Sequence, residues 1–215
     1  MNGIHGVCRA RVQRGVTSLL MLFLLAAPAL AAGQRTVLVM GDSLAAGYGL
    51  AAHQGWVDLI AQRMQSSHAG WRVVNASISG ETTAGGAARI AAALAREHPT
   101  VVVIELGAND GLRGLPLQQT RTNLESMVRA AQSAHAKVLV IGMRMPPNYG
   151  PDYTRGFEAN FVDLSKRYKT AYLPFLLAPI AGNRDAFQDD NLHPVAAVQP
   201  KLRDYVWPAL APLLR

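Results

Sequence analysis

The strongest candidates for a catalytic set in this sequence are a serine, an aspartate and a histidine: Ser43, Asp190 and His193. Ser43 follows the apolar run 36–40 and Gly41-Asp42, and a serine just after a buried strand can project into a crevice. His193 stands three residues after Asp190, and on a turn this spacing brings the carboxylate to one ring nitrogen. The other nitrogen is then free to act as a base. A nucleophilic serine needs such a base, so the pattern predicts nucleophilic catalysis by Ser43.

These positions also have structural interpretations, and residue types and spacing alone do not decide between structure and catalysis. The sequence at 41–45 lacks the second glycine of the Gly-x-Ser-x-Gly elbow, so Ser43 is alternatively a helix cap. Asp189 is an alternative partner for His193, although its position suits a cap of the turn better. The remaining histidines beyond the N-terminal segment are expected on the surface: His53, His68, His98 and His135.

Asn109 and Gly80 are suited to stabilising a negatively charged oxygen. The Asn109 side chain is an uncharged amide donor, and Gly80 offers a backbone N–H. Both residues are also common in turns, and Asn-Asp-Gly at 109–111 is a strong turn sequence. The nearby acids Asp110 and Glu81 are assigned to turns and caps. The sequence therefore nominates Asn109 and Gly80 as oxyanion donors, with turns as the alternative.

Five valine-rich apolar runs predict the strands that position these residues. They are continuous rather than alternating, which is typical of strands buried on both faces of a parallel sheet. Between them, apolar residues recur at helical spacing, and a last helix is expected over 198–214 with a bend at Pro208. This alternation predicts a three-layer α/β domain with helices on both faces of a flavodoxin-like parallel sheet of order 2-1-3-4-5. The runs lie at 36–40, 71–75, 100–106, 137–143 and 171–175.

The predicted strand order brings the candidate residues to one crevice. Strands 1 and 3 are neighbours whose connections leave in opposite directions, and ligands bind at the carboxyl ends of such a pair. Ser43 follows the first strand and Asn109 follows the third. The segment 143–153, which contains Pro146 and Pro147, is expected to be a shaped loop over this crevice, with a plain surface turn as the alternative.

The N-terminal segment changes how charge and cysteine content are interpreted. Three arginines precede an apolar run at 17–27 and an Ala-x-Ala triplet at 29–31, which predicts a secretory signal peptide over residues 1–31. An uncleaved membrane anchor is the alternative, but the run is shorter than the ~20 residues that span a bilayer. Cleavage removes Cys8, which is the sole cysteine. It also removes the three arginines, which lowers the formal net charge from +7 to +4. One domain over residues 32–215 remains.

The composition of this domain argues against several classes of function. Its mild positive excess is scattered and contains no basic run, so nucleic-acid binding has little support. The chain contains no phosphate loop and no His-Glu-x-x-His motif, so we expect no organic cofactor and no metal. We expect an exported protein, periplasmic or secreted, that is monomeric and makes at most transient contact with a membrane surface.

Four blocks in order along the chain resemble the GDSL, or SGNH, hydrolase family. Three segments, at 41–49, 107–114 and 145–150, are further similar to its bacterial subgroup of multifunctional acyl-CoA thioesterases, lysophospholipases and arylesterases. Ala108 stands where that subgroup often has a second glycine, and residues 195–199 depart from it. The four blocks are Gly41-Asp42-Ser43-Leu44, Gly80, Gly107-Ala108-Asn109-Asp110 and Asp190-Asn191-Leu192-His193-Pro194.

The resemblance implies the SGNH hydrolase fold and a role for each matching residue. Ser43 is the nucleophile, His193 the general base and acid, and Asp190 the residue that orients His193. The Ser43 N–H, the Gly80 N–H and the Asn109 side chain form the oxyanion hole. The implied substrates are carboxylic esters and thioesters of acyl chains, either small molecules or lipids. The residues implied in binding them are Met145, Pro146, Asn148 and Tyr149.

Two other functions fit the same sequence. A carbohydrate O-acetyl esterase would use the same triad, because the triad does not distinguish one leaving group from another. A doubly wound binding module without catalysis is the other, and it predicts that a serine-directed probe does not label the protein. It must treat four ordered blocks as coincidence.

Overall fold

Parallel strands form the centre of the computed structural model, which describes residues 1, 3 and 34–215. Within residues 34–215, five strands form one sheet in the order β2-β1-β3-β4-β5, which confirms the predicted order. Apart from residues 1 and 3, the predicted signal peptide lies outside the described residues, and residues 34–215 belong to one compact unit. The strands are β1 (Arg35–Gly41), β2 (Trp71–Asn75), β3 (Val101–Glu105), β4 (Lys137–Ile141) and β5 (Ala171–Leu173).

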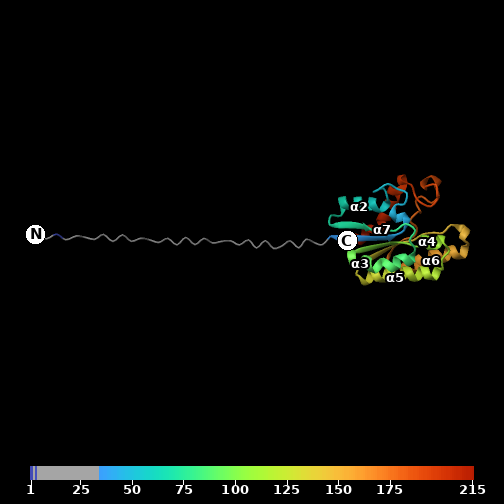
Figure 1. The fold of residues 1–215 in the computed structure, drawn as a ribbon, viewed down its shortest axis with the longest axis horizontal. Coiled ribbons are helices and arrows are strands. Elements are labelled where there is room, and N and C mark those ends of the chain that lie inside the picture. The colour runs from blue at the N-terminus through green and yellow to red at the C-terminus, as the bar shows by residue number, and fades with distance from the viewer. Residues whose placement is uncertain (2, 4–33) are drawn as a thin grey trace. The chain divides into compact units, whose positions relative to one another are not determined.

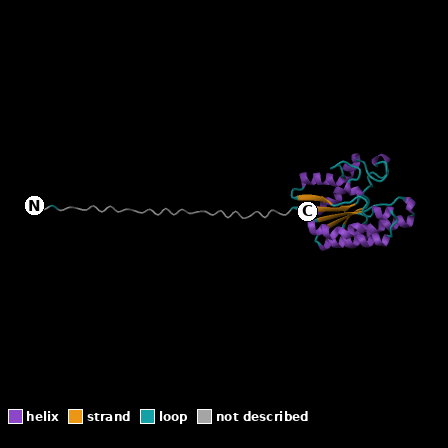
Figure 2. Ribbon diagram, viewed as in Figure 1, coloured by secondary structure: helices purple, strands orange, loops and turns teal. Residues whose placement is uncertain are grey.

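Helices cover both faces of the sheet, which confirms the predicted three layers. Figures 1 and 2 show α2 and α7 on one face, and α3, α5 and α6 on the other. The short helices α1 and α4 follow the carboxyl ends of β1 and β3. The helices are α1 (Ser43–Ala46), α2 (Trp56–Ser67), α3 (Thr83–Glu97), α4 (Ala108–Leu112), α5 (Leu117–Ser133), α6 (Pro151–Tyr168) and α7 (Gln199–Leu210).

The apolar side chains that recur at helical spacing form the core against the sheet. On α5 the predicted stripe is fully buried, and on α6 Phe157 and Phe161 are buried in the same way. Complete burial of each large apolar side chain stabilises the fold by roughly 1.5–3 kcal/mol. The α5 stripe consists of Leu124, Met127, Val128 and Ala131.

Two expectations from the sequence differ from the structure. The edge strands β2 and β5 are half-buried along most of their length, because each pairs with one neighbour only. The last helix is shorter than 198–214: α7 includes Pro208, and the chain continues as a 3₁₀ helix over Ala211–Leu214. Pro212 lies in this final turn and has no N–H to donate to an α-helical ladder.

The pairing of β1 with β3 sets the position of the loops that follow them. Gly41 is in register with Glu105, so both strands end at the same level of the sheet. The chain leaves β1 toward β2 on one side and leaves β3 toward β4 on the other, which opens a crevice between the two connections. Residues 42–48 and 107–115 therefore meet at this crevice.

Candidate active site

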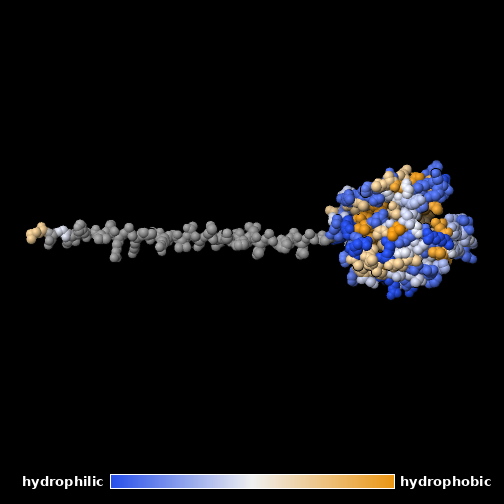
Figure 3. Space-filling model, in the orientation of Figure 1, coloured by the Kyte–Doolittle hydropathy of each residue, from blue (hydrophilic) through white to orange (hydrophobic). Residues whose placement is uncertain are grey.

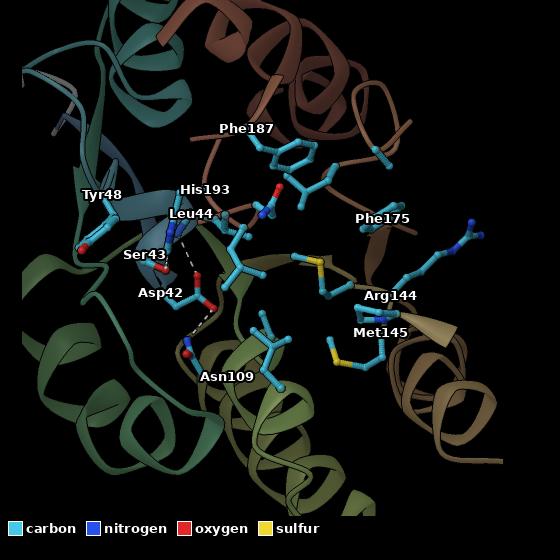
Figure 4. Close-up of a pocket in the computed structure, with 18 of the residues that line it drawn as sticks. Asp42, Ser43, Leu44, Tyr48, Asn109, Arg144, Met145, Phe175, Phe187 and His193 are labelled. Atoms are coloured by element: carbon cyan, nitrogen blue, oxygen red, sulfur yellow. Dashed lines mark hydrogen bonds between the residues drawn. The ribbon is translucent and has the colours of Figure 1, made fainter. Parts of the chain in front are cut away.

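Ser43, His193 and Asp190 form a hydrogen-bonded chain at the crevice. His193 Nε2 lies 2.8 Å from the Ser43 hydroxyl oxygen, and His193 Nδ1 lies 2.6 Å from Asp190 Oδ2. Figure 4 shows the Ser43 hydroxyl pointing toward the His193 ring. The carboxylate that contacts the ring is that of Asp190, not Asp189. In this arrangement the carboxylate selects the tautomer that leaves Nε2 free to accept the serine proton.

A tight turn holds Asp190 against His193. Asp190 Oδ1 accepts the backbone N–H groups of Leu192 and His193 at 2.9 and 3.0 Å, and Asn191 between them adopts a left-handed φ of 60°. The His193 carbonyl accepts the Gln188 N–H at 2.7 Å, which closes the loop at its base. The turn thus fixes both the backbone and the side chain of the histidine.

The same turn keeps Asp190 ionised. The backbone N–H of His193 is the largest cause, and the His193 ring and the Leu192 N–H add to it, lowering the pKa of Asp190 from 3.8 to about 2. Asp190 is therefore a carboxylate at any pH at which a histidine base works. A fixed negative charge beside His193 stabilises the imidazolium that forms during proton transfer.

Ser43 is the first residue of α1, and Asp42 rather than Ser43 is the helix cap. Asp42 Oδ1 accepts the Leu44 N–H at 3.0 Å, which leaves the Ser43 hydroxyl free to meet His193. Gly41 lets the turn pack closely: a Cβ there would lie 2.6 Å from Ala45 Cβ and 2.8 Å from Glu105 Oε2. Ser43 is therefore not the helix cap, because Asp42 fills that role.

Two buried carboxyl groups lie beneath this turn. Burial raises the pKa of Asp42 from 3.8 to about 6, although the Leu44 N–H opposes the rise. Glu105 is also buried, and both its burial and the nearby Asp42 charge raise its pKa well above 4.5. The Asp42 backbone N–H donates to Glu105 Oε2 at 3.4 Å, so the Glu105 carboxyl group contacts the backbone of the turn that carries Ser43.

We expect the contribution of Asp42 to the free energy of unfolding to fall as pH rises through the interval from 3.8 to about 6. The folded state binds the Asp42 proton more tightly than the unfolded chain does, so deprotonation costs the folded state more. Asp42→Asn cannot titrate. The free energy of unfolding of the wild type minus that of this variant should fall by as much as about 3 kcal/mol between pH ~4 and ~7.

Urea denaturation at several pH values measures this difference. Asp152→Asn is the matched control, because the Asp152 side chain is 96% exposed, and its difference from the wild type should stay nearly constant. A wild-type minus Asp42→Asn difference that stays constant or rises with pH would contradict the prediction.

The structure places Asn109 and Gly80 beside Ser43, on the same cavity wall. The Asn109 amide donates to the Glu81 carbonyl at 3.0 Å and approaches Asp42 Oδ2 at 3.3 Å. Figure 4 shows Asp42 between Ser43 and Asn109. Gly80 has a φ of 79°, a left-handed conformation that favours glycine. Within the described residues the N–H groups of Ser43 and Gly80 donate no hydrogen bond, which leaves them available to a ligand.

A buried polar network fixes the helix that carries Asn109, and the sequence did not reveal it. Asp110 accepts the Thr83 N–H at 2.8 Å and the Thr83 hydroxyl, so it joins α4 to the start of α3. Asn123 donates to the Thr83 hydroxyl at 3.1 Å. Asp110 therefore does more than cap a turn, because it fixes Asn109 relative to the segment that contains Gly80.

An apolar cavity of about 710 Å³ opens beside Ser43. This volume lies within the range of small-molecule sites. The loops 143–147 and 175–187 supply much of its wall, as Figure 4 shows for Arg144, Met145, Phe175 and Phe187. The apolar lining residues are Leu44, Ala108, Leu112, Met143, Met145, Pro146, Pro147, Phe175, Leu177, Ala181, Phe187 and Leu192.

The proposed substrate-binding residues of the 143–153 segment divide into two groups. Met145 and Pro146 line the cavity, whereas Asn148 and Tyr149 do not. The Tyr149 hydroxyl donates to the Leu112 carbonyl at 2.9 Å, so Tyr149 supports the cavity wall from behind. Reasoning from sequence missed Tyr48, whose ring centroid lies 4.5 Å from that of His193.

Within residues 34–215, no three His, Cys, Asp or Glu side chains gather in a way that could hold a metal ion. In the same residues, no helix combines the length and apolar character needed to cross a bilayer.

Known proteins resemble this chain over most of its length. The model of the GDSL-like lipase/acylhydrolase family matches residues 39–199. Esterase TesA of Pseudomonas aeruginosa is 49% identical over 183 residues, which cover 85% of this chain and 91% of that protein. Thioesterase 1/protease 1/lysophospholipase L1 of Escherichia coli K12 is 39% identical over 193 residues, 90% of this chain and 91% of that protein.

A solved structure is similar in fold as well as in sequence. The psychrotrophic esterase EstA from Pseudoalteromonas sp., inhibited by monoethylphosphonate, superposes with a TM-score of 0.80 at 40% identity. The match covers 84% of this chain and 98% of that chain.

Proposed function

The chain belongs to the GDSL-like lipase/acylhydrolase family and is an ester-bond hydrolase, and from this premise we propose that it cleaves acyl esters and thioesters by serine catalysis. Ser43 is the nucleophile, His193 the general base and acid, and Asp190 the residue that orients His193. One observation carries the proposal. The hydrogen-bonded chain from Asp190 through His193 to Ser43 ends at the mouth of an apolar cavity.

The proposed reaction passes through an acyl-enzyme. His193 Nε2 takes the Ser43 proton as Ser43 Oγ attacks the carbonyl carbon, and the negative charge moves to the carbonyl oxygen. The N–H groups of Ser43 and Gly80 and the Asn109 amide stabilise that oxygen. His193 then gives its proton to the departing alcohol or thiol. Water, activated by His193, attacks the acyl-enzyme and releases the acid.

The lining of the cavity supports acyl chains as the preferred substrates. Most of its wall is aliphatic, aromatic or thioether, which favours burial of methylene groups over recognition of sugar hydroxyls. The names of the relatives, esterase and thioesterase/lysophospholipase, agree with this class. A carbohydrate O-acetyl esterase remains the second candidate, because the triad acts on either substrate.

Rates on a graded series of p-nitrophenyl esters test the proposal. Transfer of each methylene into an apolar site contributes up to ~0.8 kcal/mol, so kcat/KM should rise at least about tenfold from the acetate to the octanoate. A lysophospholipid and an acetylated xylose complete the comparison, and Ser43→Ala shows which rates belong to this site. Faster hydrolysis of the acetylated sugar than of every long-chain ester would favour the carbohydrate esterase instead.

We further propose that the enzyme is exported and acts as a monomer. The predicted signal peptide over residues 1–31 supports export, with Ala32 as the first residue of the exported protein. Its proposed substrates are small-molecule or lipid esters, and contact with a membrane surface is transient.

A further inference from the structure

Two exposed hydrophobic side chains line the acyl cavity, and a third lies on a neighbouring loop. Within residues 34–215, three large hydrophobic side chains are exposed: Tyr48 by 53%, Ile78 by 51% and Leu192 by 45%. They come from three different loops, after β1, after β2 and before α7. Single exposed hydrophobic residues are ordinary on a protein surface, but a group around one opening is characteristic of a binding surface.

Each of the three lies close to the candidate catalytic residues. Tyr48 and Leu192 line the cavity; the Tyr48 ring lies at a tilt of 40° beside the His193 ring, and Leu192 directly precedes His193. Ile78 stands two residues before Gly80 and is not part of the cavity lining. The Ile78 N–H donates to the Gly41 carbonyl at 3.0 Å, so its loop is tied to the turn of the nucleophile.

Two exposed prolines extend the apolar rim. Pro146 and Pro147 line the cavity from the 143–147 loop and are also exposed. Tyr48, Ile78, Leu192, Pro146 and Pro147 are together called the mouth rim. Figure 3 shows hydrophilic residues over most of the viewed surface, with hydrophobic patches between them.

Positive charge stands beside the rim. Arg113 is exposed and donates to the Gly80 carbonyl at 3.0 Å, next to the candidate oxyanion donors. Arg144 is exposed, lines the cavity and pairs with Glu158 at 3.3 Å. Asp189 is an exposed acid on the catalytic loop, so the rim is not uniformly basic. A guanidinium at the edge of an apolar opening matches the phosphates above the acyl chains of a phospholipid layer.

We propose that the mouth rim is a docking surface for a phospholipid aggregate, a micelle or bilayer, from which a single-chain lipid ester enters the cavity. The inference rests on the proposed function, because the cavity is taken as the acyl site. The rim side chains insert among the lipid chains, and Arg113 contacts a headgroup phosphate. Docking places the cavity mouth within the lipid layer, so the acyl chain reaches Ser43 without first passing through water.

Binding to vesicles tests the proposal independently of catalysis. The experiment uses residues 32–215, which hold the whole sheet and its core, with Ser43→Ala so that lipid is not consumed. Co-sedimentation with phosphatidylcholine vesicles containing lysophosphatidylcholine gives the partition coefficient. Adding Ile78→Ser should lower it about tenfold, because a half-exposed isoleucine loses its apolar contact with lipid. Leu213→Ser is the control for losing an aliphatic side chain away from the rim, because Leu213 lies near the start of β4, at the opposite end of the sheet, and should not change binding. Leu213 is partly buried against the core, so the thermal unfolding midpoint of this variant is measured beside its binding.

A second measurement uses the active protein. Ile78→Ser should hydrolyse soluble p-nitrophenyl acetate at the wild-type rate but aggregated lysophosphatidylcholine about tenfold more slowly. Three results would overturn the rim as the docking surface. The protein does not bind vesicles, Ile78→Ser leaves the binding unchanged, or a further variant, Arg113→Gln, lowers the binding while Ile78→Ser does not. The protein could instead self-associate without binding vesicles, and Ile78→Ser could abolish that self-association. This result would identify a second copy of the chain as the occupant of the rim and would also overturn the proposal. Vesicle binding without any esterase activity would leave the docking surface standing and refute the proposed function.

Discussion

Ser43→Ala is expected to lower kcat for p-nitrophenyl octanoate by at least about 10⁴-fold, because the variant lacks the only atom proposed to form the acyl-enzyme. The fold should survive, since alanine is a good helix former at the start of α1 and Asp42 supplies the cap. Initial rates over a range of ester concentrations measure the effect, and the thermal unfolding midpoint reports the fold.

Ser79→Ala is the matched control for this substitution. Ser79 also lines the cavity, but the hydroxyl within hydrogen-bond distance of His193 is that of Ser43. Its removal should leave kcat within about threefold of the wild type, as is usual for a group outside the reacting set. A Ser43→Ala enzyme that keeps a tenth or more of the activity would refute the assignment of the nucleophile.

Asn109→Ala is expected to lower kcat by roughly 10²–10³-fold, the usual loss for one oxyanion donor. The amide now donates to the Glu81 carbonyl and contacts Asp42, so it is held in place before a substrate binds. Because the donor acts on the charged intermediate more than on the neutral ester, KM should change much less than kcat.

Asn148→Ala is the control for Asn109→Ala, and the same steady-state rates measure both. Asn148 lies on the loop next to the cavity but does not line it, so its removal should change kcat little. Equal losses in the two variants, or an Asn109→Ala effect confined to KM, would contradict an oxyanion role for Asn109.

Much of the fold could be predicted from the sequence, because its core elements carry unambiguous patterns. The run at 101–105 is buried at every position, as a central parallel strand requires. The stripe from Leu124 to Ala131 is buried at each of its four predicted positions. Local spacing also accounts for the approach of Asp190 to His193, since three residues on a turn span that distance.

The parts that could not be predicted depend on contacts between distant segments. Asp42 caps α1 and also meets Asn109, a pairing across 67 residues that no local motif encodes. Thr83, at the start of α3, and Asp110, in α4, are likewise joined across 27 residues, because the loops that follow β2 and β3 meet at the same edge of the sheet. The loop around Phe175 and Phe187 has no periodic pattern, so its place in the cavity wall became visible only in the folded chain.

Mapping the adduct of a fluorophosphonate probe shows directly whether Ser43 is the activated nucleophile. The probe reacts with a serine that an adjacent base activates, and mass spectrometry of peptides locates the modified residue. We expect one adduct, on the peptide that contains Ser43, which is absent from Ser43→Ala and forms far more slowly in His193→Ala. Labelling of another serine, or labelling of Ser43→Ala at the wild-type rate, would contradict the assignment of Ser43 as the nucleophile.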